Sequence, residues 1–198
     1  MSATIAPATA ATAQPVPRLL TVADLAALPG ELPTGPVKYE LEDGRLVVMA
    51  PPGDIHGSVG GNMIFHLKLA EQAGHGKAWS EVGVILRRNP DRVVAPDACF
   101  VANASLPLRT SSEGYLETIP DLVVEVRSKN DTMAELERKA GEYLAAGAKL
   151  VWVIDPLRSA AVVYQAGHPP RTLGPSDELT ADGVIHGFVL SVAGILRV

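Results

Sequence analysis

One acidic residue interrupts an apolar stretch of the sequence, PDLVVEVRSKND at residues 120–131. This residue is Glu125, and the alternation of side chains along a strand would place it on the same face as Arg127, with apolar residues filling the opposite face. A carboxylate buried in its ionised form without a partner costs several kcal/mol or takes up a proton. Its charge must therefore be offset, either by an ion pair with Arg127 or Lys129 or by a metal ion with a second ligand from elsewhere.

A second acid, Asp97, precedes another apolar segment in VVAPDACFV. Taken alone, it is an aspartate at the start of a strand, held by local hydrogen bonds. If it lay beside Glu125 on an adjacent strand, two like charges would be close together, which is costly unless a cation lies between them. Two carboxylates with waters and a substrate phosphate are the usual ligands of Mg²⁺. The pair therefore indicates phosphodiester chemistry.

A lysine in ELERKAGEYL, Lys139, borders the apolar stripe of a predicted helix. From this position its ammonium group could reach over the sheet to a metal-bound water or to a scissile phosphate. The alternative is an ion pair with Glu135 one turn earlier, worth about 0.2–0.5 kcal/mol on a solvated helix face.

The composition predicts one folded domain. The chain has 198 residues, of which 47% are hydrophobic, and this suffices for one core of ordinary size. Residues 1–17 consist mainly of Ala, Thr and Pro, a composition that cannot bury enough apolar surface to order itself. We therefore expect a disordered tail at residues 1–17 and a single domain at residues 18–198.

Charge and cysteine content bear on partners and cellular location. The net charge of −5 and the pI near 5.5 give no overall attraction for nucleic acid, so DNA binding would need a local basic patch. The single cysteine, Cys99, excludes an internal disulfide framework and a cysteine metal cluster, which fits the reducing cytoplasm. No stretch approaches the roughly 18 consecutive apolar residues that span a bilayer. We expect a cytoplasmic protein that does not contact a membrane.

Periodicity and turn residues predict an α+β fold with a mixed central β-sheet flanked by helices. The expected helices are a short one capped by Thr21, a long one at residues 55–73 capped by Asp54, and one that begins after a cap at Asp131 and stops at Gly147. The expected strands are a hairpin about Asp43-Gly44, residues 78–88 and 92–102, residues 121–126 and 149–155, and C-terminal β-structure ending in a short helix. A long polar loop at residues 103–118 separates two of the strands. The last strand, helix and strand before the C-terminal part should form a parallel crossover.

The order of these motifs resembles one family. YELEDG, a histidine before a helix, APDACFV, PDLVVEVRSKND, ERKAGEYLAAGAKLVWVIDP and a closing GFVLSV together resemble the Uma2 family of restriction-endonuclease-like proteins, a branch of the PD-(D/E)XK nuclease superfamily. The resemblance covers residues 18–198 and is most specific in the two Pro-Asp strands and the GAKLVWVIDP segment. It implies a four-stranded mixed core sheet with an added N-terminal hairpin and C-terminal β-structure, and catalytic acids on two neighbouring strands.

The resemblance also assigns roles to individual residues. It makes Asp97 and Glu125 the motif acids and the ligands of Mg²⁺ or Mn²⁺, with the carbonyl group of Val126 as a further ligand. The usual lysine of the superfamily falls at Arg127, whose guanidinium group can steady charge but cannot act as a base. Members of this family carry a lysine in the following helix instead, which matches Lys139.

Two accessory positions also match the family pattern. Glu40 would add a carboxylate at the edge of the site, although a glutamate in a hairpin is more often solvated. His56 stands at the start of the long helix and could contact a phosphate or a metal-bound water, although a histidine there is as often a surface residue.

The expected function is a magnesium-dependent endonuclease that acts on DNA as a homodimer. The metal would lower the pKa of a water that attacks phosphorus in line, and Lys139 would position that water. Arg87, Arg88 and Arg92, with Arg127 and Lys129 nearer the site, would form a basic rim that binds DNA weakly and in a salt-sensitive way. The alternative is a catalytically inactive nuclease fold that serves as a nucleic-acid- or protein-binding module.

Overall fold

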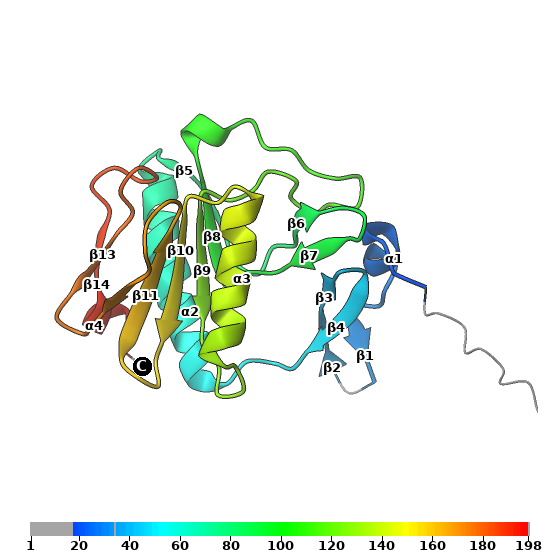
Figure 1. Cartoon of the computed structure of the whole chain (residues 1–198), viewed down its shortest axis with the longest axis horizontal. Helices are drawn as coiled ribbons and strands as arrows, with labels where there is room; N and C mark the ends of the chain where they lie inside the picture. Colours follow the sequence, from blue (N-terminus) through cyan, green and yellow to red (C-terminus); the bar gives the residue numbers. More distant parts are fainter. Residues whose placement is uncertain (1–17, 34, 198) are drawn as a thin grey trace, which may run out of the picture.

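The computed structural model describes residues 18–33 and 35–197, so the tail predicted at residues 1–17 lies outside the described residues. Its centre is a six-stranded sheet with strand order β12-β11-β10-β9-β8-β5 (Figure 1). The strands are β5 (Gly76–Trp79), β8 (Ala98–Ala102), β9 (Leu122–Val126), β10 (Leu150–Asp155), β11 (Ala160–Gln165) and β12 (Arg171–Leu173). β9 and β10 are parallel and the other neighbours are antiparallel. The mixed sheet is thus confirmed, and β11 and β12, which come from the C-terminal part of the chain, extend its other four strands.

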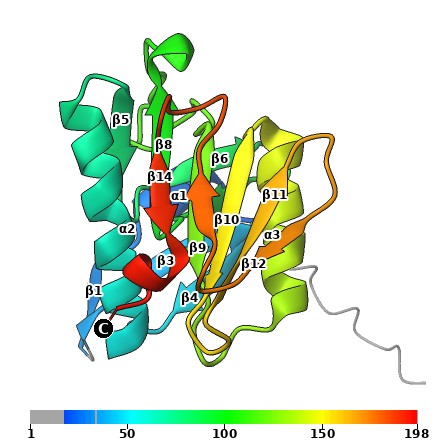
Figure 2. The ribbon, with the colours of Figure 1, turned by 90° about the vertical axis from the view of Figure 1, so that its left-hand side faces the viewer.

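Both faces of this sheet are covered (Figure 2). Helix α2 (Asp54–Gln72) packs on one face with β13 (Glu178–Thr180), β14 (Val189–Ser191) and α4 (Val192–Ile195). Helix α3 (Met133–Ala146) covers the other face and links β9 to β10 in the expected parallel crossover. Among the described helices, none combines the length and the apolar character that a bilayer span requires.

The helix caps differ in detail from the expected ones. Helix α2 has Gly53 as its N-cap, and Asp54 is its first residue, where a negative charge favours the helix dipole. Helix α3 is capped by Thr132, because Thr132 and Glu135 exchange the hydrogen bonds of a capping box. Asp131, the predicted cap, instead accepts a hydrogen bond from the amide of Ser128 at 2.7 Å.

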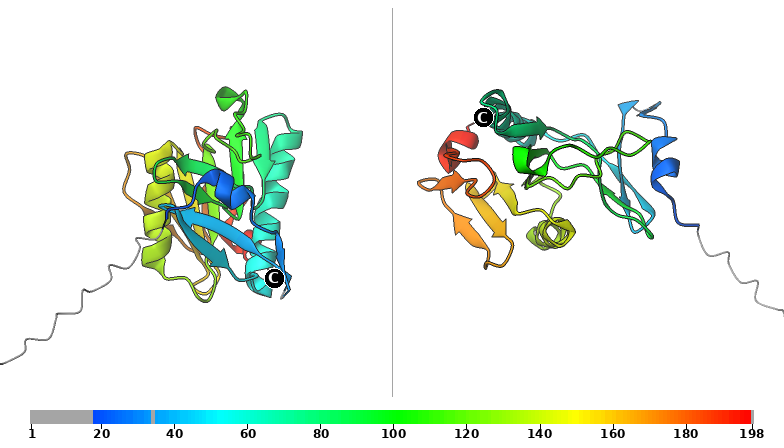
Figure 3. Two further views of the ribbon diagram at one scale, coloured as in Figure 1. Left: turned by 90° about the vertical axis from the view of Figure 1, so that its right-hand side faces the viewer. Right: turned by 90° about the horizontal axis from the view of Figure 1, so that it is seen from above.

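A smaller sheet of order β4-β3-β7-β6 lies beside the central one (Figure 3). Its strands are β3 (Lys38–Glu42), β4 (Arg45–Met49), β6 (Val84–Arg87) and β7 (Arg92–Val94), and the short α1 (Val22–Ala26), β1 (Glu31–Leu32) and β2 (Gly35–Pro36) accompany them. The predicted hairpin of β3 and β4 is confirmed, with φ angles of 52° at Asp43 and 74° at Gly44. Positive φ at both central residues is what a tight two-residue hairpin turn requires.

The two strands predicted at residues 78–88 and 92–102 are each split between the two sheets. β5 and β8 belong to the central sheet, whereas β6 and β7 belong to the smaller one. The breaks fall at Gly83, whose α-carbon packs so closely on Tyr115 that a β-carbon would lie 2.2 Å from its ring, and at Pro96, which has no amide hydrogen for a sheet. Asp97 follows this second break and directly precedes β8.

Two glycines offer a matched test of this packing. A β-carbon at Gly76 would lie 2.2 Å from the carbonyl oxygen of Val101, whereas one at Gly57 on α2 would meet nothing within 4 Å. We expect Gly76→Ala to destabilise the fold by about 1–3 kcal/mol through overpacking, and Gly57→Ala to stabilise it by about 0.5–1 kcal/mol through helix propensity. Urea unfolding followed by circular dichroism measures both. Equal effects of the two substitutions would contradict the packing described here.

Candidate active site

Glu125 lies in the middle of the central sheet on β9, and its side chain points to the face that α3 covers. It is 5% exposed. The hydroxyl group of Tyr143 donates a hydrogen bond to Oε1 of Glu125 at 2.6 Å, and Nζ of Lys139 lies 3.0 Å from the same oxygen. Burial raises the pKa of Glu125 to about 7, against the attraction of Lys139 and with added repulsion from Asp97. An ion pair at Glu125 was expected with Arg127 or Lys129, and this choice of partner was wrong, because the pair is formed with Lys139.

Asp97 lies next to Glu125 across the sheet. The ladder between β8 and β9 ends at the pair of Ala98 and Val124, so Asp97, which directly precedes β8, lies beside the part of β9 that carries Glu125. Oδ2 of Asp97 accepts a hydrogen bond from the amide of Val126 at 2.7 Å. Nε2 of His56, in the first turn of α2, lies 3.3 Å from the same oxygen.

The ammonium group of Lys139 lies between two carboxylates. Nζ is 3.0 Å from Oε1 of Glu125 and 3.1 Å from Oε1 of Glu40. Burial alone would lower the pKa of Lys139, but the charges of Glu125 and Glu40 outweigh it and raise the pKa above its usual value. The alternative pair with Glu135 was wrong, because the carboxylate of Glu135 is used in the cap of α3.

Glu40 on β3 is buried, so the expectation that a hairpin glutamate is solvated was wrong. Its side chain is 6% exposed, and it accepts hydrogen bonds from the amide of Ala95 at 3.1 Å and from Arg92 at 3.3 Å. Arg92 also donates to Glu142 on α3 at 2.8 Å. Because the side chain of Arg92 is only 5% exposed, it cannot belong to the basic rim that the sequence predicted.

The histidine and the remaining arginine at the site are both tied to acids. A hydrogen bond from His56 to Asp97 raises the pKa of the imidazole, and the charge of Asp97 adds to this shift. Arg127 pairs with the buried Asp155 at the end of β10 at 2.9 Å, and not with Glu125. The structure therefore brings the predicted residues together at the carboxyl end of β9, where Arg127 follows the strand.

Two carboxylate oxygens remain open to a ligand. No described residue donates a hydrogen bond to Oδ1 of Asp97 or to Oε2 of Glu125, since the contacts above engage Oδ2 and Oε1. Within the described ranges, no group of three or more His, Cys, Asp or Glu side chains is arranged to hold a metal ion. Two carboxylates completed by waters fit Mg²⁺, which keeps several waters in protein sites, better than a metal that needs a full protein cage.

Two residues of this cluster, Tyr143 and Arg92, were missed as site residues. Tyr143 belongs to the apolar stripe of α3, but its hydroxyl group reaches Glu125. A buried tyrosine hydroxyl needs a hydrogen-bond partner, and this need is the available signal. Arg92 gave no comparable signal, because exposed and buried arginines look alike in sequence.

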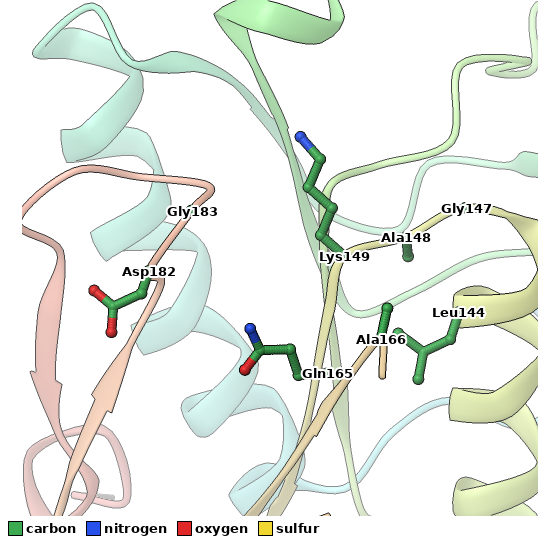
Figure 4. A pocket seen from close by; sticks show the side chains of 8 residues that line it. All are labelled: Leu144, Gly147, Ala148, Lys149, Gln165, Ala166, Asp182 and Gly183. Carbon is green, nitrogen blue, oxygen red and sulfur yellow. The ribbon is translucent and has the colours of Figure 1, made fainter. Parts of the chain in front are cut away.

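A hollow elsewhere in the molecule lies at the opposite end of the central sheet, where β10 begins and β11 ends (Figure 4). Of the charged residues that line it, Lys149 is paired with the buried Asp121 at 2.8 Å, and Asp182 is exposed. It brings no two acids together and is not a candidate for the same chemistry.

The fold and the paired acids place the protein among restriction-endonuclease-like proteins. A solved structure, described as a putative nuclease of DUF820 from Anabaena variabilis ATCC 29413, superposes with a TM-score of 0.72 over 89% of this chain and 97% of that one, at 16% identity. The model of the Uma2 family, described as "Putative restriction endonuclease", matches residues 22–193, and the chain belongs to this family. No curated protein matches the sequence. The resemblance seen in the sequence is thereby confirmed.

The raised pKa of Glu125 predicts a pH dependence of stability. An unfolded glutamate has a pKa of about 4.3, so between about pH 5 and pH 7 the folded protein holds a proton on Glu125 that the unfolded chain has lost. The free energy of unfolding of the metal-free protein should therefore fall as pH rises through this window, by up to about 1.4 kcal/mol per pH unit.

Urea unfolding at several pH values measures this slope. Glu125→Gln should remove most of the slope below about pH 6.5, above which His56, whose pKa is also raised, adds a slope of its own. Glu137→Gln, at an exposed position of α3, should keep the wild-type slope. Identical pH profiles for wild type and Glu125→Gln would show that Glu125 does not titrate in this range.

Proposed function

We propose that the protein is a metal-dependent endonuclease that hydrolyses phosphodiester bonds in DNA. The observation that supports this best is the convergence of Asp97 and Glu125 from neighbouring strands, each with one oxygen free of hydrogen bonds from the described residues. Membership of a family described as "Putative restriction endonuclease" supports the same reaction class.

Asp97 and Glu125 would hold Mg²⁺ through Oδ1 and Oε2, and the carbonyl group of Val126 would be a further ligand. When bound, this ion would polarise a phosphate oxygen and lower the pKa of a coordinated water. The contacts that the two acids already make orient their free oxygens, because His56 and the amide of Val126 fix Asp97 while Tyr143 and Lys139 fix Glu125.

Lys139 would act as a fixed positive charge. Its raised pKa keeps the ammonium group protonated near neutral pH, so it suits the stabilisation of negative charge that develops on the phosphate and does not suit the role of a base. Positioning by Glu40 and Glu125 means that this charge needs no rearrangement during the reaction.

DNA would be bound weakly at the open end of β9. Arg87 forms an ion pair with Asp43 and Arg88 with Glu117, and Arg92 is buried. Fewer unpaired basic side chains are therefore left to bind DNA than the sequence predicted. Lys129 is exposed just beyond β9 and would contribute to it. Because phosphate contacts release counterions, binding should weaken as salt increases.

A plasmid assay tests the proposed reaction. With Mg²⁺ or Mn²⁺ at low salt, the wild-type protein should convert supercoiled DNA to nicked or linear forms, and EDTA should abolish the conversion. Asp97→Ala should lower the rate at least about 100-fold, as expected for loss of a metal ligand at a catalytic centre. Asp182→Ala, at the opposite end of the sheet, should cut as the wild type does. Cutting by Asp97→Ala at the wild-type rate would refute the assignment.

An inactive binding module is the second candidate, and one observation favours it. Each acid already has a partner that can carry a positive charge, His56 for Asp97 and Lys139 for Glu125, so neither carboxylate requires a metal ion to offset its charge. Under this alternative, DNA would be retained in a mobility-shift experiment but left intact with either metal over a range of salt concentrations.

A further inference from the structure

The ammonium group of Lys139 joins two acids from different sheets. Glu40 comes from β3 of the smaller sheet and Glu125 from β9 of the central sheet, and each places its Oε1 within 3.1 Å of Nζ. Their side chains are 6% and 7% exposed, and that of Lys139 is 14% exposed. The two carboxylates therefore lie within two hydrogen-bond lengths of each other in a nearly dry environment, where repulsion between like charges is strong unless a cation intervenes.

The two carboxylate oxygens of Glu125 have different surroundings. Oε1 accepts a hydrogen bond from Tyr143 and lies beside the ammonium group of Lys139. Oε2 accepts no hydrogen bond from the described residues, and neither does Oδ1 of Asp97. A divalent ion shared with Asp97 would thus bind Oε2 of Glu125, because Oε1 already contacts the positive charge of Lys139.

We propose that Lys139 is a built-in second cation, which takes the position between Glu40 and Glu125 that a second metal would fill and so limits the site to one divalent ion. Enzymes that use two metal ions place them a few ångströms apart on shared carboxylates. Glu125 would be such a shared carboxylate here, with Mg²⁺ on one oxygen and the ammonium group on the other. This inference rests on the proposed function.

The surroundings of Lys139 hold it in this position. Glu40 is fixed on its other oxygen by Arg92 and through the amide of Ala95 on Oε1, and Glu125 is fixed by Tyr143. Arg92 is itself anchored to Glu142. Leaving the position would expose two buried carboxylates without compensation, a change that costs several kcal/mol in proteins.

The number of bound Mn²⁺ ions tests the inference without measuring activity. Isothermal titration calorimetry, with electron paramagnetic resonance to count free Mn²⁺, should give one ion per wild-type chain. Lys139→Ala leaves two facing carboxylates and room for an ion, so it should bind two. Lys139→Gln, which removes the charge with a smaller change in side-chain volume, should also gain a second, weaker Mn²⁺, because its shorter, neutral side chain leaves the charges of both acids without compensation. It serves if Lys139→Ala does not show the wild-type circular dichroism spectrum.

Two controls locate the second ion. Glu40→Gln combined with Lys139→Ala should return to one Mn²⁺, because one of the two facing charges is gone. Lys149→Ala, which removes a lysine paired with Asp121 at the far end of the sheet, should bind one.

The outcomes separate this inference from the proposed function. Two ions in the wild type, or a single ion in folded Lys139→Ala and Lys139→Gln, would overturn the role of Lys139 and leave the metal-dependent nuclease standing. No Mn²⁺ bound to the wild type at millimolar concentration would overturn the proposed metal site itself.

Discussion

The burial of one carboxylate organises this molecule. Glu125 lies in a sheet that is covered on both faces, at a position where an unpaired charge is strongly unfavourable. α3 supplies Lys139 and Tyr143 to this carboxylate, and the ammonium group in turn requires Glu40 from the smaller sheet. Arg92 then compensates Glu40. Within this cluster, each buried charge thus lies beside one of opposite sign.

The smaller sheet therefore forms part of the candidate site, because it supplies Glu40 and Arg92. The chain passes from the central sheet to the smaller one after β5 and returns after β7, and Asp97 lies at the return. Asp97 lies outside the regular hydrogen bonding of either sheet, so its side chain can lie at the end of β9 and accept a hydrogen bond from the amide of Val126. The same crossing brings β3, which carries Glu40, against α3. The geometry of the candidate site thus follows from the sheet topology.

Local patterns predicted most of the elements, because periodicity and turn residues are local properties. The Asp43-Gly44 turn, the apolar run around Glu125 and the stripe of α3 each identified its element. The partners of buried charges depend on contacts distant in sequence, which explains why Glu40 was expected to be solvated and Glu125 to pair with Arg127. The division of two strands between two sheets was missed for a related reason, since an apolar alternation looks the same in either sheet. Membership of the Uma2 family narrowed the candidate acids but did not indicate Tyr143 or Arg92.

The contact between Glu40 and Lys139 spans 99 residues of the chain, and this separation bears on how the protein folds. Closing so long a loop has a large entropic cost that must be met before the contact contributes any stability. The crossover of β9, α3 and β10 can form from a short segment, but the charge cluster is complete only when the N-terminal hairpin has docked. A partly folded chain in which this hairpin has not docked would thus contain Glu125 and Lys139 without Glu40, and the buried charges would be left incompletely paired.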